Sequence, residues 1–202
     1  VAFDLTNAGS PVGRLELPVP GVHNAQNATA AAVMALLLGA EFDAAASALA
    51  RFGGVARRFQ FRGEVAGVTF VDDYAHNPGK VAAVLAAARN GGWRRVVCIF
   101  QPHLYSRTAD LVDDFGRAFT DADVVVNTDI YGAREEPRPG VTGKLIVDAI
   151  TGADHGKRVV WLPRHADLMR VVPTLLRPGD LCLVAGAGDI TQLPDELMSA
   201  MS

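Results

Sequence analysis

The sequence predicts an α/β fold, with a mainly parallel sheet and helices on both faces. Five strand-like runs alternate with helical patterns, and each run is apolar throughout; the runs are 68–72, 95–100, 123–128, 158–162 and 181–185. Strands that are covered on both sides have this composition, and strand–helix alternation is typical of parallel βαβ units. With 202 residues, half of them apolar, the chain is long enough to bury one large core and a small second one.

The first part of the chain predicts a hairpin followed by two helices. Residues 1–17 contain the strand-like runs VAFDL and GRLEL, joined by the turn-rich stretch Asn7–Pro11. The helices are expected at about 24–38 and 43–51, each ending close to glycine. The glycine pair at 53–54 is the expected boundary between two domains, 1–54 and 55–202.

The second part predicts another hairpin at 59–73 and then helices between the strands. The helix after Asn77 illustrates the reasoning, since Pro78 suits a first helical turn and apolar residues recur on one face from Val81 to Ala88. Asn77 is expected to cap this helix. The helices are expected at 78–90, 108–119, 141–150 and 165–176.

Composition and charge exclude several classes of protein. The net charge of −3 is small and no basic stripe is present, so nucleic acid is not an expected partner. The most apolar stretch, Ala28–Gly39, is too short to span a bilayer and no leader precedes it, which predicts a cytoplasmic protein without a membrane partner. Cys98 and Cys182 lie in apolar runs and are expected to be buried thiols. Because the chain opens on Val1, we expect it to be part of a longer protein.

Polar loops follow four of the five predicted strands. They read DDYAHNP after Val71, QPHLYSR after Phe100, TDIYGAREE after Asn127 and GAGDIT after Ala185. In a parallel sheet the ligand crevice forms outside the carboxyl ends of the strands. The sequence therefore predicts a small-molecule site at this edge.

Two adjacent carboxylates, Asp72 and Asp73, end the first of these strands. Neighbouring residues of a strand point to opposite faces, so the pair is not expected to bind one metal or to share a proton. One of them is expected to face the crevice and the other to support the backbone. Solvated strand-end charges are the alternative interpretation.

Histidines and an arginine occupy the same loops. His76 and His103 should be adjacent in space, where either could orient a substrate or transfer a proton. A structural histidine is the alternative for each, and it is the expectation for His155 and His165. Arg107 is expected at the start of a helix, where the dipole disfavours a cation, which suggests that it is held for an anion such as a carboxylate.

Two asparagines near a helix start, Asn24 and Asn27, lie three residues apart on one face. An asparagine side chain presents a donor and an acceptor together, which suits the edge of a purine such as adenine. Helix capping explains Asn24 almost as well, but it does not explain Asn27.

The motifs together resemble a known family. GVHNAQNATAA, FGGVARRFQFRG, DDYAHNPGKV, FQPHLYSRT, DIYGAREEP and GAGDIT closely resemble, in this order, the UDP-N-acetylmuramate–L-alanine ligases of peptidoglycan synthesis, which belong to the Mur ligase family. The resemblance covers essentially the whole chain. The DDY-x-H and FQPH-x-x-[ST]-R combination is specific to these ligases and to a relative that recycles murein tripeptide.

The resemblance implies a three-domain ligase, of which residues 1–54 are the end of the central ATP-binding domain and 55–202 the carboxy-terminal Rossmann-like domain. The phosphate loop and the Mg²⁺ ligands are expected upstream of Val1, so this chain alone should be inactive. In the implied reaction, ATP phosphorylates the carboxylate of UDP-N-acetylmuramate, and the amine of L-alanine attacks the acyl phosphate.

The resemblance also implies roles for individual residues. The nucleotide contacts are Asn24, Asn27, Arg58 and Asp73, with Asp73 near the ribose; the alanine contacts are Tyr74, His76, His103 and Arg107; and the catalytic residues are Arg58, His76 and His103. The chain departs from the family pattern at Asn77, Gly79, Lys80 and Leu104. Two alternatives stay open: the tripeptide-recycling ligase, and a metal-dependent hydrolase with an Asp/His site.

Overall fold

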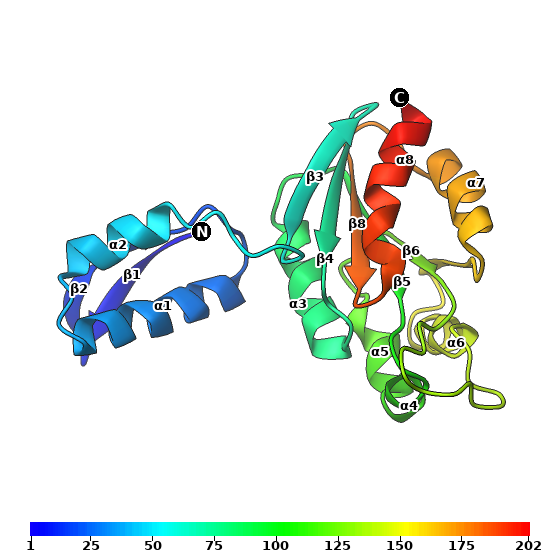
Figure 1. The fold of residues 1–202 in the computed structure, drawn as a ribbon, viewed down its shortest axis with the longest axis horizontal. Coiled ribbons are helices and arrows are strands. Elements are labelled where there is room, and N and C mark those ends of the chain that lie inside the picture. Colours follow the sequence, from blue (N-terminus) through cyan, green and yellow to red (C-terminus); the bar gives the residue numbers. More distant parts are fainter. The chain divides into compact units, whose positions relative to one another are not determined.

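The computed structural model describes all residues from Val1 to Ser202, which divide into two compact units, Val1–Val55 and Ala56–Ser202. In the first unit, β1 (Ala2–Asn7) and β2 (Ser10–Glu16) form an antiparallel hairpin, as the sequence predicts. Two helices, α1 (Val22–Leu37) and α2 (Phe42–Ala50), pack against each other and against the hairpin (Figure 1).

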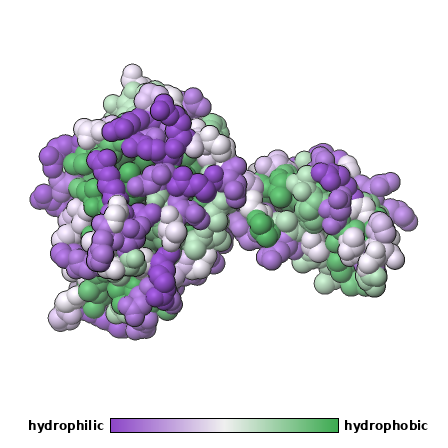
Figure 2. Space-filling model, turned by 180° about the vertical axis from the view of Figure 1, so that it is seen from behind, coloured by the Kyte–Doolittle hydropathy of each residue, from purple (hydrophilic) through white to green (hydrophobic).

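The helices of the first unit bury small residues and expose large ones. Ala28 and Ala32 of α1 and Ala45 of α2 are buried, which lets the backbones approach closely. Large apolar side chains remain exposed along and after α1, namely Val22, Val33, Met34, Leu37 and Leu38. Figure 2 accordingly shows hydrophobic residues on the surface of this unit. An apolar surface of this extent is typical of a face that contacts another structure.

The second unit is built on one six-stranded sheet. Its strands are β3 (Gln60–Val65), β4 (Val68–Asp73), β5 (Arg95–Gln101), β6 (Val124–Asn127), β7 (Arg158–Trp161) and β8 (Asp180–Gly186). They are ordered β3-β4-β8-β5-β6-β7. Only the edge strand β3 is antiparallel to its neighbour, so the mainly parallel sheet is confirmed.

Helices cover both faces of this sheet (Figure 1). On one face lie α3 (Pro78–Arg89), α5 (Val112–Ala118) and α6 (Lys144–Ala153); on the other lie α7 (His165–Leu175), α8 (Leu193–Met201) and the single turn η1 (Asp189–Gln192). Strand β5 shows why its sequence is apolar throughout. Cys98 and Phe100 belong to the first core and Val97 and Ile99 to the second, so successive side chains enter opposite cores.

Three helices differ from the sequence prediction. The helix expected at 108–119 is divided at Leu111 into α4 (Tyr105–Asp110) and α5. The helix expected at 141–150 begins only at Lys144, with Gly143 as its N-cap; the Gly143 carbonyl accepts a hydrogen bond from Asn127, and its N–H donates to Asp129. Helix α8 was not predicted, although Pro194 in its first turn and the buried pair Leu193 and Leu197 are signals for a helix.

The start of α3 agrees with its prediction. Asn77 has extended backbone, and its side-chain oxygen accepts a hydrogen bond from the backbone N–H of Lys80 at 3.0 Å. Pro78 follows in the first turn. We expect Asn77→Ala to lower the free energy of unfolding by about 1 kcal/mol, because one backbone N–H loses its partner. Urea denaturation measures this, with Asn90→Ala at the exposed other end of α3 as the control. An equal loss in both variants would show that the cap has no special role.

Both cysteines lie in the core of the sheet, as expected. Cys98 and Cys182 are free and fully buried. Burial raises the pKa of the Cys98 thiol to about 12 and also raises the pKa of Cys182. The thiolate is the reactive form, so both are structural apolar side chains and not nucleophiles.

Candidate functional site

The four polar loops come together at one edge of the sheet. They follow β4, β8, β5 and β6, which are neighbours in that order and run parallel. Their carboxyl ends therefore meet at the same edge. The loops supply Tyr74 and His76, the Gly186–Asp189 stretch, His103, and Tyr131.

Four rings from three of these loops form a row, which we call the aromatic row: Tyr74, His76, His103 and Tyr131. The Tyr74 and His76 ring centroids are 5.0 Å apart in an edge-to-face arrangement. His76 lies 5.8 Å from His103, and His103 stacks on Tyr131 at 5.8 Å with 19° between the ring planes. The structure thus brings together three of the residues predicted for the alanine end, and it adds Tyr131.

Backbone hydrogen bonds fix His103 against Tyr131. The N–H of Leu104 donates to the Tyr131 carbonyl at 3.0 Å, and the N–H of Tyr131 donates to the Pro102 carbonyl at 2.8 Å. Leu104 has a φ of +74°, a left-handed conformation that is unusual for a residue with a side chain. Backbone of this kind persists where the surroundings impose it, as at binding sites.

The two predicted arginines contact different rings of the row, Arg58 the end ring Tyr74 and Arg107 the inner ring His103. Arg58 places its guanidinium carbon 5.6 Å from the centre of the Tyr74 ring, and Arg57 lies 4.8 Å from the same ring. Arg107 donates through Nη1 to the His103 carbonyl at 3.2 Å and lies 3.1 Å from His103 Nδ1. Arg107 is the third residue of the six-residue helix α4, so it lies near a helix start as predicted, although in so short a helix it also belongs to the last turn. Its contacts with His103 are what hold it at the site.

The hydrogen bonds assign different proton positions to the two histidines. His76 Nδ1 lies 2.7 Å from the Tyr74 carbonyl, which can only accept, so Nδ1 carries the proton and Nε2 keeps a lone pair. His103 Nδ1 faces the arginine donor, so its proton is on Nε2. At one site the structure therefore offers a proton acceptor on His76 and a donor on His103.

Burial and nearby cations favour the neutral form of both rings. The pKa of His76 is lowered by burial first and further by the charges of Arg107 and Lys80, against the raising effect of its hydrogen bond to the Tyr74 carbonyl. The pKa of His103 is lowered by burial and by Arg107, against an opposing effect of Glu135. Both rings are therefore ready to act as neutral acid–base groups at neutral pH.

We expect both rings to titrate below their ordinary value of 6.5. A histidine whose pKa is lower in the folded state stabilises the fold fully above 6.5, and this contribution is lost as the pH falls from 6.5 through the folded-state value. NMR titration of the ring protons in this chain measures the two values. Arg107→Ala is the matched comparison and should raise both, because it removes a cation. Values at or above 6.5 in the unsubstituted chain would contradict the prediction.

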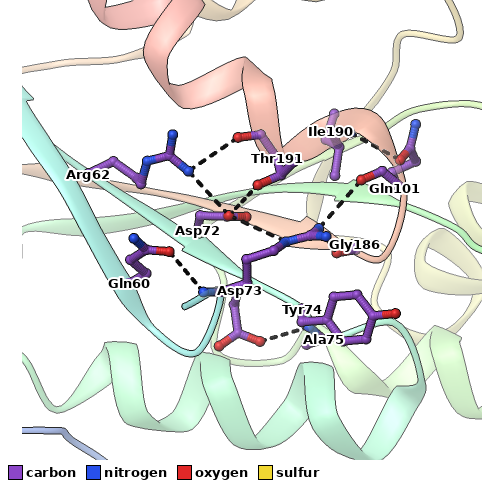
Figure 3. A network of polar contacts seen from close by, with 12 residues as sticks. Gln60, Arg62, Asp72, Asp73, Tyr74, Ala75, Gln101, Gly186, Ile190 and Thr191 are labelled. Carbon is purple, nitrogen blue, oxygen red and sulfur yellow. Dashed lines mark hydrogen bonds and ion pairs between the residues drawn. The ribbon is translucent and has the colours of Figure 1, made fainter. Parts of the chain in front are cut away.

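The two aspartates at the end of β4 point to opposite sides of the strand, as predicted, but the expectation that one faces an open crevice was wrong. Asp72 is fully buried and Asp73 is 6% exposed. Asp73 accepts hydrogen bonds from the N–H groups of Phe59 and Ala75, both at 2.7 Å, and Figure 3 shows the bond from Ala75. Burial raises the pKa of Asp73, against the lowering effect of these two bonds. Asp73 is thus the aspartate that supports the backbone, and its contact with a ribose stays a prediction.

The asparagines Asn24 and Asn27 lie in the first unit. Helix α1 begins after Gly21, so the capping alternative for Asn24 was wrong. The side chain of Asn24 instead donates to the Pro20 carbonyl at 2.6 Å. Asn27 is exposed on the same helix, and its side chain makes no hydrogen bond within the protein.

Sequence reasoning missed several residues of this edge. Glu135 accepts hydrogen bonds from the backbone N–H and the hydroxyl of Ser106, which hold the first turn of α4, the helix that carries Arg107. Tyr131 also borders a concavity of about 440 Å³. That concavity is lined by residues that include Gln101, Asp129, Asp189 and Glu196. Tyr74, His76 and His103 of the aromatic row do not line it. The available signal was that these residues follow strands of the same sheet.

Comparison with known proteins agrees with the geometry. Residues 57–188 match the family model described as "Mur ligase, glutamate ligase domain". UDP-N-acetylmuramate–L-alanine ligase from Anaeromyxobacter sp. (strain Fw109-5) is 48% identical over 100% of this chain and 43% of its own length, and that from Pelotomaculum thermopropionicum is 45% identical over 99% of this chain and 43% of its own. The chain thus spans less than half the length of these relatives.

Solved structures give the same result. UDP-N-acetylmuramate-alanine ligase from Thermotoga maritima matches with a TM-score of 0.79 and 29% identity, over 95% of this chain and 40% of that one. A murein peptide ligase from Psychrobacter arcticus shares the fold, with a TM-score of 0.69 and 24% identity over 99% of this chain and 42% of that one. Because the family model covers most of the unit that carries the aromatic row, the chain belongs to the Mur ligase family.

Proposed function

We propose that this chain is the carboxy-terminal part of an ATP-dependent ligase that joins L-alanine to UDP-N-acetylmuramate in peptidoglycan synthesis. The observation that carries the proposal is the grouping of His76, His103 and Arg107 at one edge of the sheet, with a free Nε2 lone pair on His76. The relatives that are named for this reaction match this chain over its full length.

The geometry suits the amino acid in two respects. Arg107 makes hydrogen bonds through Nη1 only, so its Nη2 and Nε edge is available to grip the carboxylate of alanine with two parallel bonds. The amine must lose a proton before it can attack, and the lone pair of His76 Nε2 can accept it. His103 Nε2–H can donate to the alanine carboxylate or to the oxyanion of the tetrahedral intermediate.

ATP, when bound, supplies the phosphoryl group that activates the muramate carboxylate. Arg58 fits a nucleotide contact because its guanidinium forms no ion pair within the protein and lies against Tyr74, the first ring of the aromatic row. Asn27 has a free side-chain amide for the base, and Asn24 and Asp73 are the further proposed contacts. The residues that would hold Mg²⁺ are proposed to lie upstream of this chain.

The two units correspond to two proposed domains. Residues 1–54 are the end of the central ATP-binding domain, and 55–202 are the amino-acid-binding domain. The large apolar side chains that α1 exposes support the first assignment, since the remainder of such a domain would cover them. No helix of the structure has the length and apolar character needed to cross a membrane. We place the ligase in the cytoplasm, where UDP-N-acetylmuramate, L-alanine and ATP would be its partners.

The alternatives have less support. A tripeptide-recycling ligase shares the fold, but relatives named for alanine ligation are 43–48% identical to this chain. A metal-dependent hydrolase needs at least three protein ligands in one place. No three His, Cys, Asp or Glu side chains form such a group, and Asp72 and Asp73 are both occupied by protein contacts.

The test uses the full-length enzyme that contains this chain. We expect ADP and phosphate to form only when UDP-N-acetylmuramate and L-alanine are both present, and the 202-residue chain alone to hydrolyse no ATP. Competition between L-alanine and murein tripeptide separates the two ligase functions. Preference for the tripeptide would favour recycling, and hydrolysis that needs no ATP but needs added zinc would favour the hydrolase.

A further inference from the structure

A fully buried carboxylate lies behind the end of β4, on the side away from Asp73 (Figure 3). Asp72 Oδ2 accepts a hydrogen bond from the Thr191 hydroxyl at 2.6 Å. Two guanidinium groups share the same oxygen, with Arg57 Nε at 3.6 Å and Arg62 Nη1 at 3.5 Å. A buried carboxylate is tolerated only with such partners, so Asp72 gathers three segments around one charge.

Arg57 extends this cluster to the loop after β8. Its Nη2 donates to the Gly186 carbonyl at 2.7 Å and lies 3.5 Å from the Gly188 carbonyl. One side chain therefore ties its own segment both to the end of β4 and to the end of β8. The contact to Gly186 spans 129 residues of sequence, which explains why no local pattern indicated it.

The segment that Arg57 anchors, residues 57–59, has unusual backbone. Arg57 has a φ of +59° and Phe59 a φ of +45°. Non-glycine residues adopt this left-handed conformation at an energetic cost and keep it only where contacts impose it. The contacts here are the Arg57 N–H to Gln60 Oε1 at 2.8 Å, the Tyr74 N–H to the Arg57 carbonyl at 2.8 Å, and the Phe59 N–H to Asp73.

Arg58 lies between these two fixed residues, and its side chain faces the Tyr74 ring. We propose that Asp72 is a positioning residue: through Arg57 it holds the segment 57–59, so that Arg58 is presented to the nucleotide at the end of the aromatic row. This inference rests on the proposed ligase function, because the nucleotide contact of Arg58 belongs to that reaction.

A purely structural role for Asp72 is the competing explanation, and the molecule offers a matched pair that separates the two. Arg57 and Arg62 each bring one cation to Asp72 and are similarly exposed, at 25% and 21%. The other contacts of Arg62 are a hydrogen bond to the Thr191 carbonyl and an ion pair with Asp195 of α8. Only Arg57 belongs to the segment that carries Arg58.

The experiment measures steady-state kinetics of the full-length ligase with Arg57→Ala, Arg62→Ala and Asp72→Asn. Arg57→Ala and Asp72→Asn should raise the KM for ATP about tenfold or more and leave the KM for UDP-N-acetylmuramate unchanged, whereas Arg62→Ala should change the KM for ATP less than twofold. In the double variant Arg57→Ala/Asp72→Asn, the KM for ATP should rise no further than in the more affected single variant, since both residues act through one contact. Equal effects of Arg57→Ala and Arg62→Ala would overturn the positioning role.

A second measurement does not depend on the reaction. Amide hydrogen exchange in the 202-residue chain should become about tenfold faster at Tyr74 and Phe59 in Arg57→Ala, and should be unchanged there in Arg62→Ala. If the unsubstituted full-length enzyme fails to ligate alanine, the proposed function is overturned while this comparison still tests the anchoring of the segment. If exchange at both amides is the same in the two variants, the anchoring itself is disproved. If Asp72→Asn does not fold, the comparison of Arg57→Ala with Arg62→Ala is sufficient to test the proposal.

Discussion

Replacing Arg107 by alanine in the full-length ligase should raise the KM for L-alanine by roughly 30-fold to several thousand-fold. Truncating one partner of a hydrogen-bonded charge pair costs about 2–5 kcal/mol, and each 1.4 kcal/mol is a factor of ten. The guanidinium is held ready by its Nη1 contacts with His103, so its loss removes a preformed carboxylate site. Initial rates as a function of alanine concentration, at saturating ATP and UDP-N-acetylmuramate, measure the effect.

Two further substitutions sharpen this prediction. Arg107→Lys keeps the charge but cannot form two parallel bonds with a carboxylate. Its KM for alanine should therefore lie between the values for the unsubstituted enzyme and for Arg107→Ala. Arg117→Ala removes an exposed arginine of α5 that pairs only with Asp114, and it should leave the KM for alanine unchanged. An Arg107→Ala enzyme whose rate depends on alanine as the unsubstituted enzyme does would refute the assigned role.

Replacing His76 by phenylalanine should lower kcat by about 100-fold or more, because general acid–base catalysis by a placed side chain contributes about 10²–10⁴-fold. Phenylalanine keeps a ring of similar size beside Tyr74 and His103 but has no Nε2 lone pair. The pH dependence of kcat is the informative measurement. The unsubstituted enzyme should lose activity as the pH falls through a value below 6.5, since burial and the nearby cations lower the pKa of His76.

The control is a histidine outside the row. His165 lies on α7, where its Nε2 is 2.7 Å from Glu196, and His165→Phe should leave kcat and its pH dependence unaltered. In His76→Phe the decline at acid pH should disappear from the pH profile. If it persists with an unchanged kcat, the proton acceptor is another group.

The strands of the sheet could be predicted from the sequence, but their order in the sheet could not. Strands such as β5 could be predicted because both of their faces are buried, which leaves an uninterrupted apolar run. The insertion of β8 between β4 and β5 depends on pairings between residues more than 80 positions apart, such as Arg95 with Asp180. No local pattern encodes such a pairing. Helix α8 could have been predicted from its sequence but was missed, because its apolar pattern is short.

The candidate site shows the same division. The sequence indicates the segments that follow the strands, because polar and titratable residues come directly after apolar runs. These segments include His76, His103 and Arg107. Arg57 could not, because its role is visible only in its contact with Gly186. The two aspartates were correctly assigned to opposite sides, but their burial depends on partners such as Thr191 that come from the far end of the chain. The roles of the site residues in catalysis stay predictions.

The central place of β8 has a consequence for how the molecule is made. β4 and β5 are consecutive in the chain but do not pair with each other; each pairs with β8, whose residues leave the ribosome after those of every other strand. Before β8 is available, β3 and β4 can therefore pair only apart from β5, β6 and β7. A nascent chain that stops before Asp180 has a gap where the middle strand belongs. The aromatic row, which takes rings from the loops after β4, β5 and β6, is complete only once that last strand is inserted.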